Sequence, residues 1–84
     1  MSEQGNLLTN AYLVLATSFK EDYLHNIELI ETLEEVYIDK NTWPDTKEMT
    51  KECLGILYKM RDENERKAQR YRALSCFIRE TEMK

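Results

Sequence analysis

The sequence predicts an all-α protein, an antiparallel helical hairpin of two long helices. Apolar residues recur at spacings of three and four over two long stretches, as amphipathic helices require. A short segment that contains the one proline, residues 41–44, separates the two stretches. We expect a single domain over residues 1–84, with a helix over 7–39, a turn over 40–44 and a helix over 45–81.

The first helix is expected to start after Asn6, which is a suitable N-cap. Its apolar arc consists of Leu8, Tyr12, Leu15, Ala16, Phe19, Tyr23, Ile27, Ile30, Leu33 and Tyr37. The weak point lies at Thr17 and Ser18, because Ser18 and Glu21 could form a capping box and start a new helix. We expect one bent helix here, with a break near residue 17, and so three helices, as the alternative.

Pro44 ends the first stretch, since it lacks an amide hydrogen and disfavours a helical conformation for Trp43. Either Thr42 or Asp45 could cap the second helix. We expect Trp43 to fold over the end of the hairpin as a lid, with a role as an exposed partner anchor as the alternative.

The second helix has an apolar stripe with a polar middle. Its members are Met49, Cys53, Ile56, Leu57, Met60, Asn64, Ala68, Tyr71, Leu74 and Ile78. A turn centred near residue 42 makes facing residue numbers sum to roughly 84, to within one helical turn. Cys53 and Cys76 lie too far apart on one helix to form a bridge. They are expected to be reduced, half-buried residues.

Composition sets limits on function. The chain has 84 residues, 33% of them charged, and a net charge of −4. An acidic balance argues against general binding to nucleic acid, because phosphates attract an excess of Lys and Arg. No apolar run reaches the length of a membrane span and no signal-like segment is seen. We therefore expect a cytoplasmic protein that does not interact with membranes.

Residues 11–16 are apolar on nearly every side of the first helix. A helix of that kind is normally covered all round, and a single partner helix cannot do this. We expect Leu7, Ala11, Leu13 and Val14 to be covered by a second copy, giving a homodimeric four-helix bundle, or by a larger protein. A third helix formed by residues 6–16 folding back is the alternative.

Phe77 is a second misfit, because it lies on the outward face of the second helix with Lys59, Arg66 and Arg70. These four residues could form a docking stripe for an acidic partner. A solvated basic face with a terminal aromatic residue is the alternative. The same arginines, repeated in a dimer, could instead bind RNA or DNA.

Signals for catalysis are weak. There is no glycine-rich phosphate loop, no cysteine pair at metal spacing and no serine nucleophile motif. His25 with Asp22 resembles half of a metal site, but an ordinary surface histidine explains it as well. We therefore expect no catalytic residue, metal or cofactor.

A set of acids gives the one enzymatic alternative. Its members are Glu28, Glu31, Glu34, Asp62 and Glu65. Such spacings are similar to those of small helical nucleotide pyrophosphohydrolases, which would imply Mg²⁺-dependent hydrolysis. In a chain so rich in Glu they also arise by chance, so we expect a protein that is not an enzyme.

The sequence thus favours a non-catalytic helical protein-interaction module, acting as an adaptor, chaperone or inhibitor. At the level of pattern it resembles helical-hairpin secretion chaperones, small virus-encoded inhibitors of bacterial enzymes and plasmid copy-control bundles. A homodimeric four-helix bundle that binds RNA or DNA through a basic helix face is the alternative.

Overall fold

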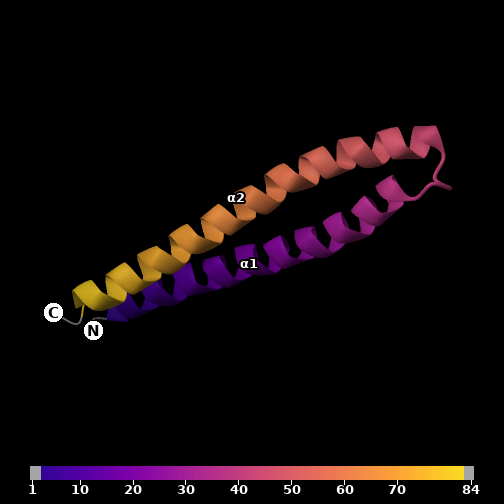
Figure 1. The fold of residues 1–84 in the computed structure, drawn as a ribbon. Helices are drawn as coiled ribbons and strands as arrows, with labels where there is room; N and C mark the ends of the chain where they lie inside the picture. The colour runs from indigo at the N-terminus through magenta and orange to yellow at the C-terminus, as the bar shows by residue number, and fades with distance from the viewer. Residues whose placement is uncertain (1–2, 83–84) are drawn as a thin grey trace.

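The protein is a rod made of two long helices. The computed structural model describes residues 3–82, which form α1 (Glu3–Ile38) and α2 (Pro44–Glu82). The helices run antiparallel, so that both chain ends lie at one end of the rod and the turn lies at the other (Figure 1). The Cα atoms extend over 61 × 13 × 13 Å. The predicted all-α helical hairpin is confirmed.

Helix α1 is continuous through Thr17 and Ser18. The predicted alternatives, a break near residue 17 and a fold-back of residues 6–16, are therefore wrong. The segment stays helical because it already has a neighbour: Tyr12 and Phe19 both stack on Tyr71 of α2. The helix also begins before Asn6, so the predicted N-cap lies inside it.

The turn is short and held by local hydrogen bonds. Pro44 is the first residue of α2. An N–H at this position makes no hydrogen bond within a helix, so the absence of one in proline costs nothing. Trp43 is consequently the capping residue, and its carbonyl accepts the Lys47 N–H at 3.0 Å. The predicted cap at Thr42 or Asp45 is wrong, since the Thr42 hydroxyl instead donates to the Val36 carbonyl at 2.8 Å.

Trp43 does not close the end of the hairpin. Its side chain is 78% exposed, so the predicted lid is wrong. A residue that precedes proline is held in an extended conformation, and here that conformation leaves the indole in solvent. The alternative role of Trp43, as an exposed anchor, stays a prediction.

The two helices meet along what we call the seam. Its residues recur with a strict repeat of seven: Thr9, Tyr12, Ala16, Phe19, Tyr23, Asn26, Ile30 and Leu33 in α1, and Thr50, Leu54, Leu57, Arg61, Asn64, Ala68, Tyr71 and Ser75 in α2. This spacing is the geometry of a left-handed coiled coil. The Ser75 hydroxyl donates to the Thr9 carbonyl, a pair whose numbers sum to the predicted 84.

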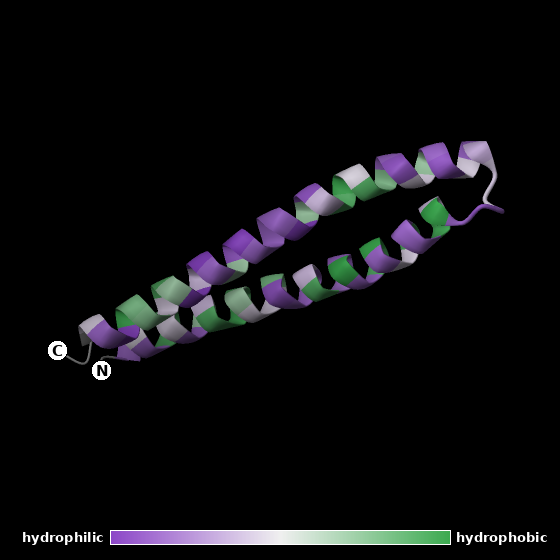
Figure 2. Ribbon diagram, viewed as in Figure 1, coloured by the Kyte–Doolittle hydropathy of each residue, from purple (hydrophilic) through white to green (hydrophobic). Residues whose placement is uncertain are grey.

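The predicted apolar arcs only partly coincide with the seam. Leu8, Leu15, Ile56 and Met60 were expected to face the other helix but are exposed. The physical reason is that the arcs assume 100° per residue, whereas a packed seam repeats every 3.5 residues, a drift of about 20° per heptad. Each helix is therefore rotated about its axis relative to the predicted arc, and part of its apolar stripe faces the side of the rod instead of the other helix. Figure 2 shows hydrophobic residues along most of α1 but a hydrophilic middle in α2.

The resulting core is small. Within the described residues, the buried apolar side chains are Ala16, Ile30 and Leu54. The other buried side chains are polar: Thr9, Asn26, Thr50 and Ser75. A core of this kind gives a single hairpin little hydrophobic stabilisation.

Candidate interaction surfaces

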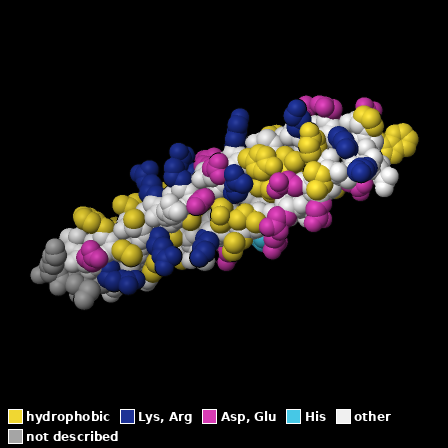
Figure 3. Space-filling view, viewed as in Figure 1, with side chains coloured by type: hydrophobic (Ala, Val, Ile, Leu, Met, Phe, Trp, Pro, Cys, Tyr) yellow, Lys and Arg dark blue, Asp and Glu magenta, His cyan; other side chains and the backbone are white. Residues whose placement is uncertain are grey.

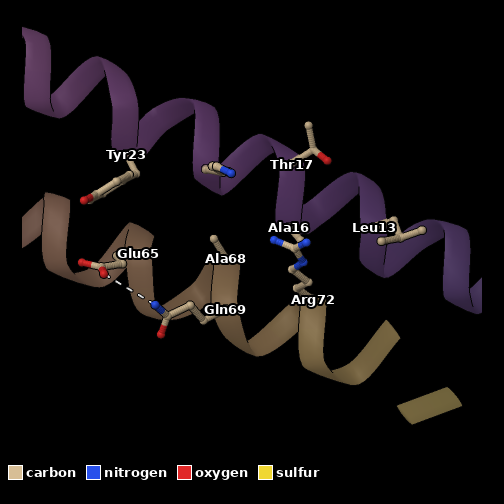
Figure 4. A pocket seen from close by; sticks show the side chains of 9 residues that line it. Leu13, Ala16, Thr17, Tyr23, Glu65, Ala68, Gln69 and Arg72 are labelled. Atoms are coloured by element: carbon tan, nitrogen blue, oxygen red, sulfur yellow. Dashed lines mark hydrogen bonds between the residues drawn. The ribbon is translucent and has the colours of Figure 1, made fainter. Parts of the chain in front are cut away.

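One flank of the rod contains two open clefts between the helices. The first, of about 480 Å³, is lined by Leu13, Ala16, Thr17, Lys20, Tyr23, Glu65, Ala68, Gln69 and Arg72. Figure 4 shows Tyr23, Glu65 and Arg72 around it, with Gln69 donating to Glu65 at 3.5 Å. The second, of about 520 Å³, lies nearer the turn and is lined by Tyr37, Ile38 and Tyr58, among others. We call this side the cleft flank; its lining carries both charge signs.

The opposite flank is mostly apolar. Each helix contributes to this flank one row of residues spaced seven apart. The row lies across the seam from the cleft flank, which contains Leu13 and Lys20. The row of α1 is Leu8, Leu15, Asp22, Leu29 and Val36, and that of α2 is Thr46, Cys53, Met60, Lys67 and Leu74. We call the seven apolar members of these rows, from Leu8 to Leu74, the apolar flank. Leu15 is 40% exposed and Leu29 48%.

Two charged residues interrupt the apolar flank near its middle. The Lys67 ammonium lies 2.8 Å from the Glu63 carboxylate and 5.3 Å from the centre of the Phe19 ring. The hydrogen bond and charge of Lys67 lower the pKa of Glu63. Asp22, by contrast, has no ion-pair partner among the described residues. Apart from Thr46 at the turn end, the two rows are therefore apolar toward both ends, with one anion and one cation between them.

The outward surfaces of the rod are a third region. On α1 the residues that point away from α2 include Leu7 and Val14, and Val14 is 68% exposed. On α2 the corresponding row includes Lys59 and Arg66, both of which are exposed. These two rows face in opposite directions, because each row points away from the other helix. One flat partner surface therefore cannot contact both.

The eight predicted contact residues are thus divided among separate surfaces. Ala11 is exposed beside the apolar flank, and Leu13 is half-buried in the first cleft. Arg70 and Phe77 are exposed in the row that borders the apolar flank on α2, and Phe77 is 65% exposed. Leu7 and Val14 face away from Lys59 and Arg66, so the two predicted contact sets do not form one surface, and their role in binding stays a prediction.

The predicted basic stripe is interrupted. Glu63 occupies the same row as Arg70, one heptad before it, and pairs with Lys67. On the face that Figure 3 presents, Lys and Arg side chains lie among acidic side chains and apolar patches. The local field around the arginines is weakened accordingly.

Sequence reasoning missed the apolar flank as a unit. Leu15 and Met60 were expected to face the other helix, and Leu29 lies outside both predicted apolar arcs. The signal that identifies the flank is the seven-residue repeat beside the seam, Leu8, Leu15 and Leu29 in one helix and Cys53, Met60 and Leu74 in the other. Both free cysteines, Cys53 and Cys76, are exposed, so the predicted half-burial is wrong.

Signals for other kinds of site are few. Across residues 3–82, no group of three or more His, Cys, Asp or Glu side chains is placed to hold a metal ion. Glu28, Glu31 and Glu34 are exposed, as are Asp62 and Glu65 of the other helix. Neither helix, over the described part of the chain, has a segment long and apolar enough to cross a membrane.

Comparison with protein-family models finds no match, and comparisons with curated proteins and with solved structures find none either.

Proposed function

We propose that this protein is a non-enzymatic interaction module that binds and covers a surface of a larger protein, as an adaptor, chaperone or inhibitor. The observation that carries the proposal is the exposure of large apolar side chains. Seven of them in the described chain are more than 60% exposed: Leu7, Val14, Ile38, Trp43, Met49, Ile56 and Phe77. We also propose that it acts in the cytoplasm, where its two free cysteines would remain reduced.

Exposed apolar surface favours association, because each Å² of it that is removed from water contributes about 25 cal/mol of favourable free energy. Scattered single residues on a protein surface need no such explanation. Here, however, the seven strongly exposed apolar residues outnumber the three buried apolar residues of the core. In addition, Trp and Arg are among the residue types that most often dominate the free energy of binding. This distribution supports a chain whose stability and function both depend on contacts with other molecules.

The row of Arg70 and Phe77 is the best-supported contact for a larger protein. Phe77 offers an aromatic anchor, and the Arg70 guanidinium offers a planar set of donors for a carboxylate. Lys59 and Arg66 lie exposed in the neighbouring row. A partner with an apolar pocket bordered by acidic residues would match this surface.

Capture from an extract of the source cells tests the proposal. The wild-type chain is compared with Phe77→Glu and Val14→Glu, and with Glu21→Gln as a matched control at an outward position of α1. We expect Phe77→Glu to lose the captured protein and Glu21→Gln to retain it, with both variants as helical as the wild type. Equal capture by all four proteins would contradict the assigned contacts.

A nuclease-treated extract and a salt titration then address nucleic acid. Binding through phosphates weakens steeply with ionic strength, whereas binding through Phe77 changes little. If nuclease treatment removes the captured material and the affinity falls steeply with salt, the interaction is with RNA or DNA and the proposal is wrong.

A further inference from the structure

We infer that the apolar flank is covered by a second copy of this chain, in a dimer whose twofold axis runs along the rod so that both turns lie at the same end. The apolar flank borders the Arg70 and Phe77 row but does not include it, and the inference does not rest on the proposed binding of a larger protein. It follows from the area of the hairpin, the pattern of the flank and the placement of its two charges.

The first observation is excess surface. The chain exposes 6713 Å². A compact monomer of 10.1 kDa exposes about 5,300 Å², so this hairpin carries roughly 1,400 Å² more. A stable interface of standard size buries roughly 800 Å² on each partner, which is about the area of one flank measuring 61 by 13 Å. Covering one flank with a second copy is sufficient to bring the surface toward that of a compact protein.

The second observation is the width of the apolar stripe. Helices of a two-stranded coiled coil are apolar at two of seven positions, whereas helices of a bundle add a third position on one side of that seam. Here Leu8, Leu15, Leu29 and Val36 supply that third position in α1. Cys53, Met60 and Leu74 supply it in α2, on the same flank. Each helix is therefore patterned for two neighbours but has one within the chain.

The third observation selects a second copy as the occupant. When the flanks of two copies face each other, the apolar residues near each end of one flank contact apolar residues of the other. The charged residues at the middle of one flank then face the charged residues of the other. That middle level contains one carboxylate, Asp22, which lacks an ion-pair partner within the described hairpin, and one ammonium, Lys67, which is partly exposed and pairs with Glu63 of its own chain at 2.8 Å. A second copy supplies both the apolar surface and the opposite charge at the required level.

The same charges select the orientation. A twofold axis along the rod sets α1 of one copy against α2 of the other, so Asp22 approaches Lys67 of the second copy, twice by symmetry. A twofold axis across the rod sets α1 against α1, and the two Asp22 carboxylates then face each other at the centre. Like charges that face each other in an interface are unfavourable. The arrangement with both turns at one end is therefore preferred.

Spin-label distances in the intact chain test the arrangement. Cys53→Ala and Cys76→Ala leave Asn41→Cys, in the turn, as the one labelled site. With both turns at one end, four helices spaced about 8–10 Å apart hold the labels within roughly 30 Å of each other. With the turns at opposite ends, the labels lie about one rod length apart, and the rod is 61 Å long. The long distance, or a monomer without a dipolar signal, would overturn the inference.

Charge reversal tests the pairing itself by sedimentation velocity. We expect Asp22→Lys to weaken self-association at least about tenfold, because Lys67 of the second copy then meets a like charge. Adding Lys67→Asp should restore it. Glu21→Lys, the same charge change at an adjacent outward position, serves as the control and should leave self-association unchanged. Equal effects of Asp22→Lys and Glu21→Lys, or no recovery in the exchanged pair, would contradict the pairing.

Discussion

The Asn64 side-chain amide donates to the Asn26 side-chain oxygen across the seam at 2.8 Å. Asn26 is 8% exposed and Asn64 is half-buried, and both occupy seam positions at which apolar residues would otherwise pack. A buried polar pair at seam positions sets the register of a coiled coil, because any slip leaves an amide without a partner. These two residues thus determine how α1 and α2 are aligned at the middle of the rod.

Asn64→Ala should destabilise the protein by about 1–3 kcal/mol, since it leaves the Asn26 amide without its partner across the seam. The double variant Asn26→Leu/Asn64→Leu should be at least as stable as the wild type, because it removes both polar groups together. Urea unfolding followed by circular dichroism measures both. A double variant less stable than Asn64→Ala would show that the amide pair itself stabilises the fold.

Tyr71 anchors the terminal half of the rod, because its ring stacks on both Tyr12 and Phe19 with centroid separations of 5.8 and 5.7 Å. Tyr71→Ala should cost about 2–3 kcal/mol, since it removes two aromatic contacts and half-buried surface. Tyr71→Phe, which keeps the ring, should stay within about 0.5 kcal/mol of the wild type. Thermal or urea unfolding would contradict the assignment if the two variants were equally destabilised.

The Thr9 hydroxyl is buried without a hydrogen-bond partner among the residues that the structure describes. Thr9→Val keeps the shape of the side chain and removes the unpaired polar group. We expect an increase in the free energy of unfolding of about 1 kcal/mol. Thr9→Ser is the matched control, which keeps the hydroxyl but loses a methyl group and should be less stable than the wild type. A destabilised Thr9→Val would mean that the hydroxyl does have a partner.

The Glu63–Lys67 pair predicts a small pH dependence. The hydrogen bond and charge of Lys67 lower the pKa of Glu63 below its ordinary value of 4.5. A carboxylate whose pKa is lower in the folded state adds stability above the ordinary value, and loses it as the pH falls through the folded value. The pair should thus contribute at neutral pH and cease to contribute in acid, well below pH 4.5.

Glu63→Gln tests this prediction. Its free energy of unfolding should be slightly below that of the wild type at neutral pH, and the difference should vanish in acid. Because both side chains are partly exposed, added salt should also reduce the difference. A difference that persists unchanged in acid would show that Glu63 stabilises the helix through packing rather than through its charge.

Much of the fold could be predicted from the sequence because helices and turns depend on local patterns. The repeat of three and four marked both helices, and Pro44 marked the turn between them. The continuity of α1 through Thr17 and Ser18 was harder to predict, since a local capping signal competes there with contacts that form only in the folded chain. Tyr71 packs against residues on both sides of this point, and that tertiary contact decides the outcome.

The interaction surfaces were harder to predict than the helices. Whether Leu15 or Met60 faces the seam or the side depends on the rotation of each helix about its axis, and a wheel drawn at 100° per residue accumulates an error over ten turns. Trp43 shows a different limit. Its size suggests burial, but its position before Pro44 leaves it in solvent.

In the inferred dimer, the apolar flank of one hairpin is covered by a second copy of the chain. The molar mass measured by light scattering over a dilution series tests this dimer most directly. We expect the wild-type mass to rise with concentration from 10.1 kDa toward twice that value. Leu29→Glu, on the apolar flank, should remain monomeric. Leu24→Glu should still associate, because Leu24 is similarly exposed, at 47% against 48%, but lies one heptad after Thr17, on the side of the cleft flank. A wild-type protein that stays at 10.1 kDa at every concentration would contradict the account.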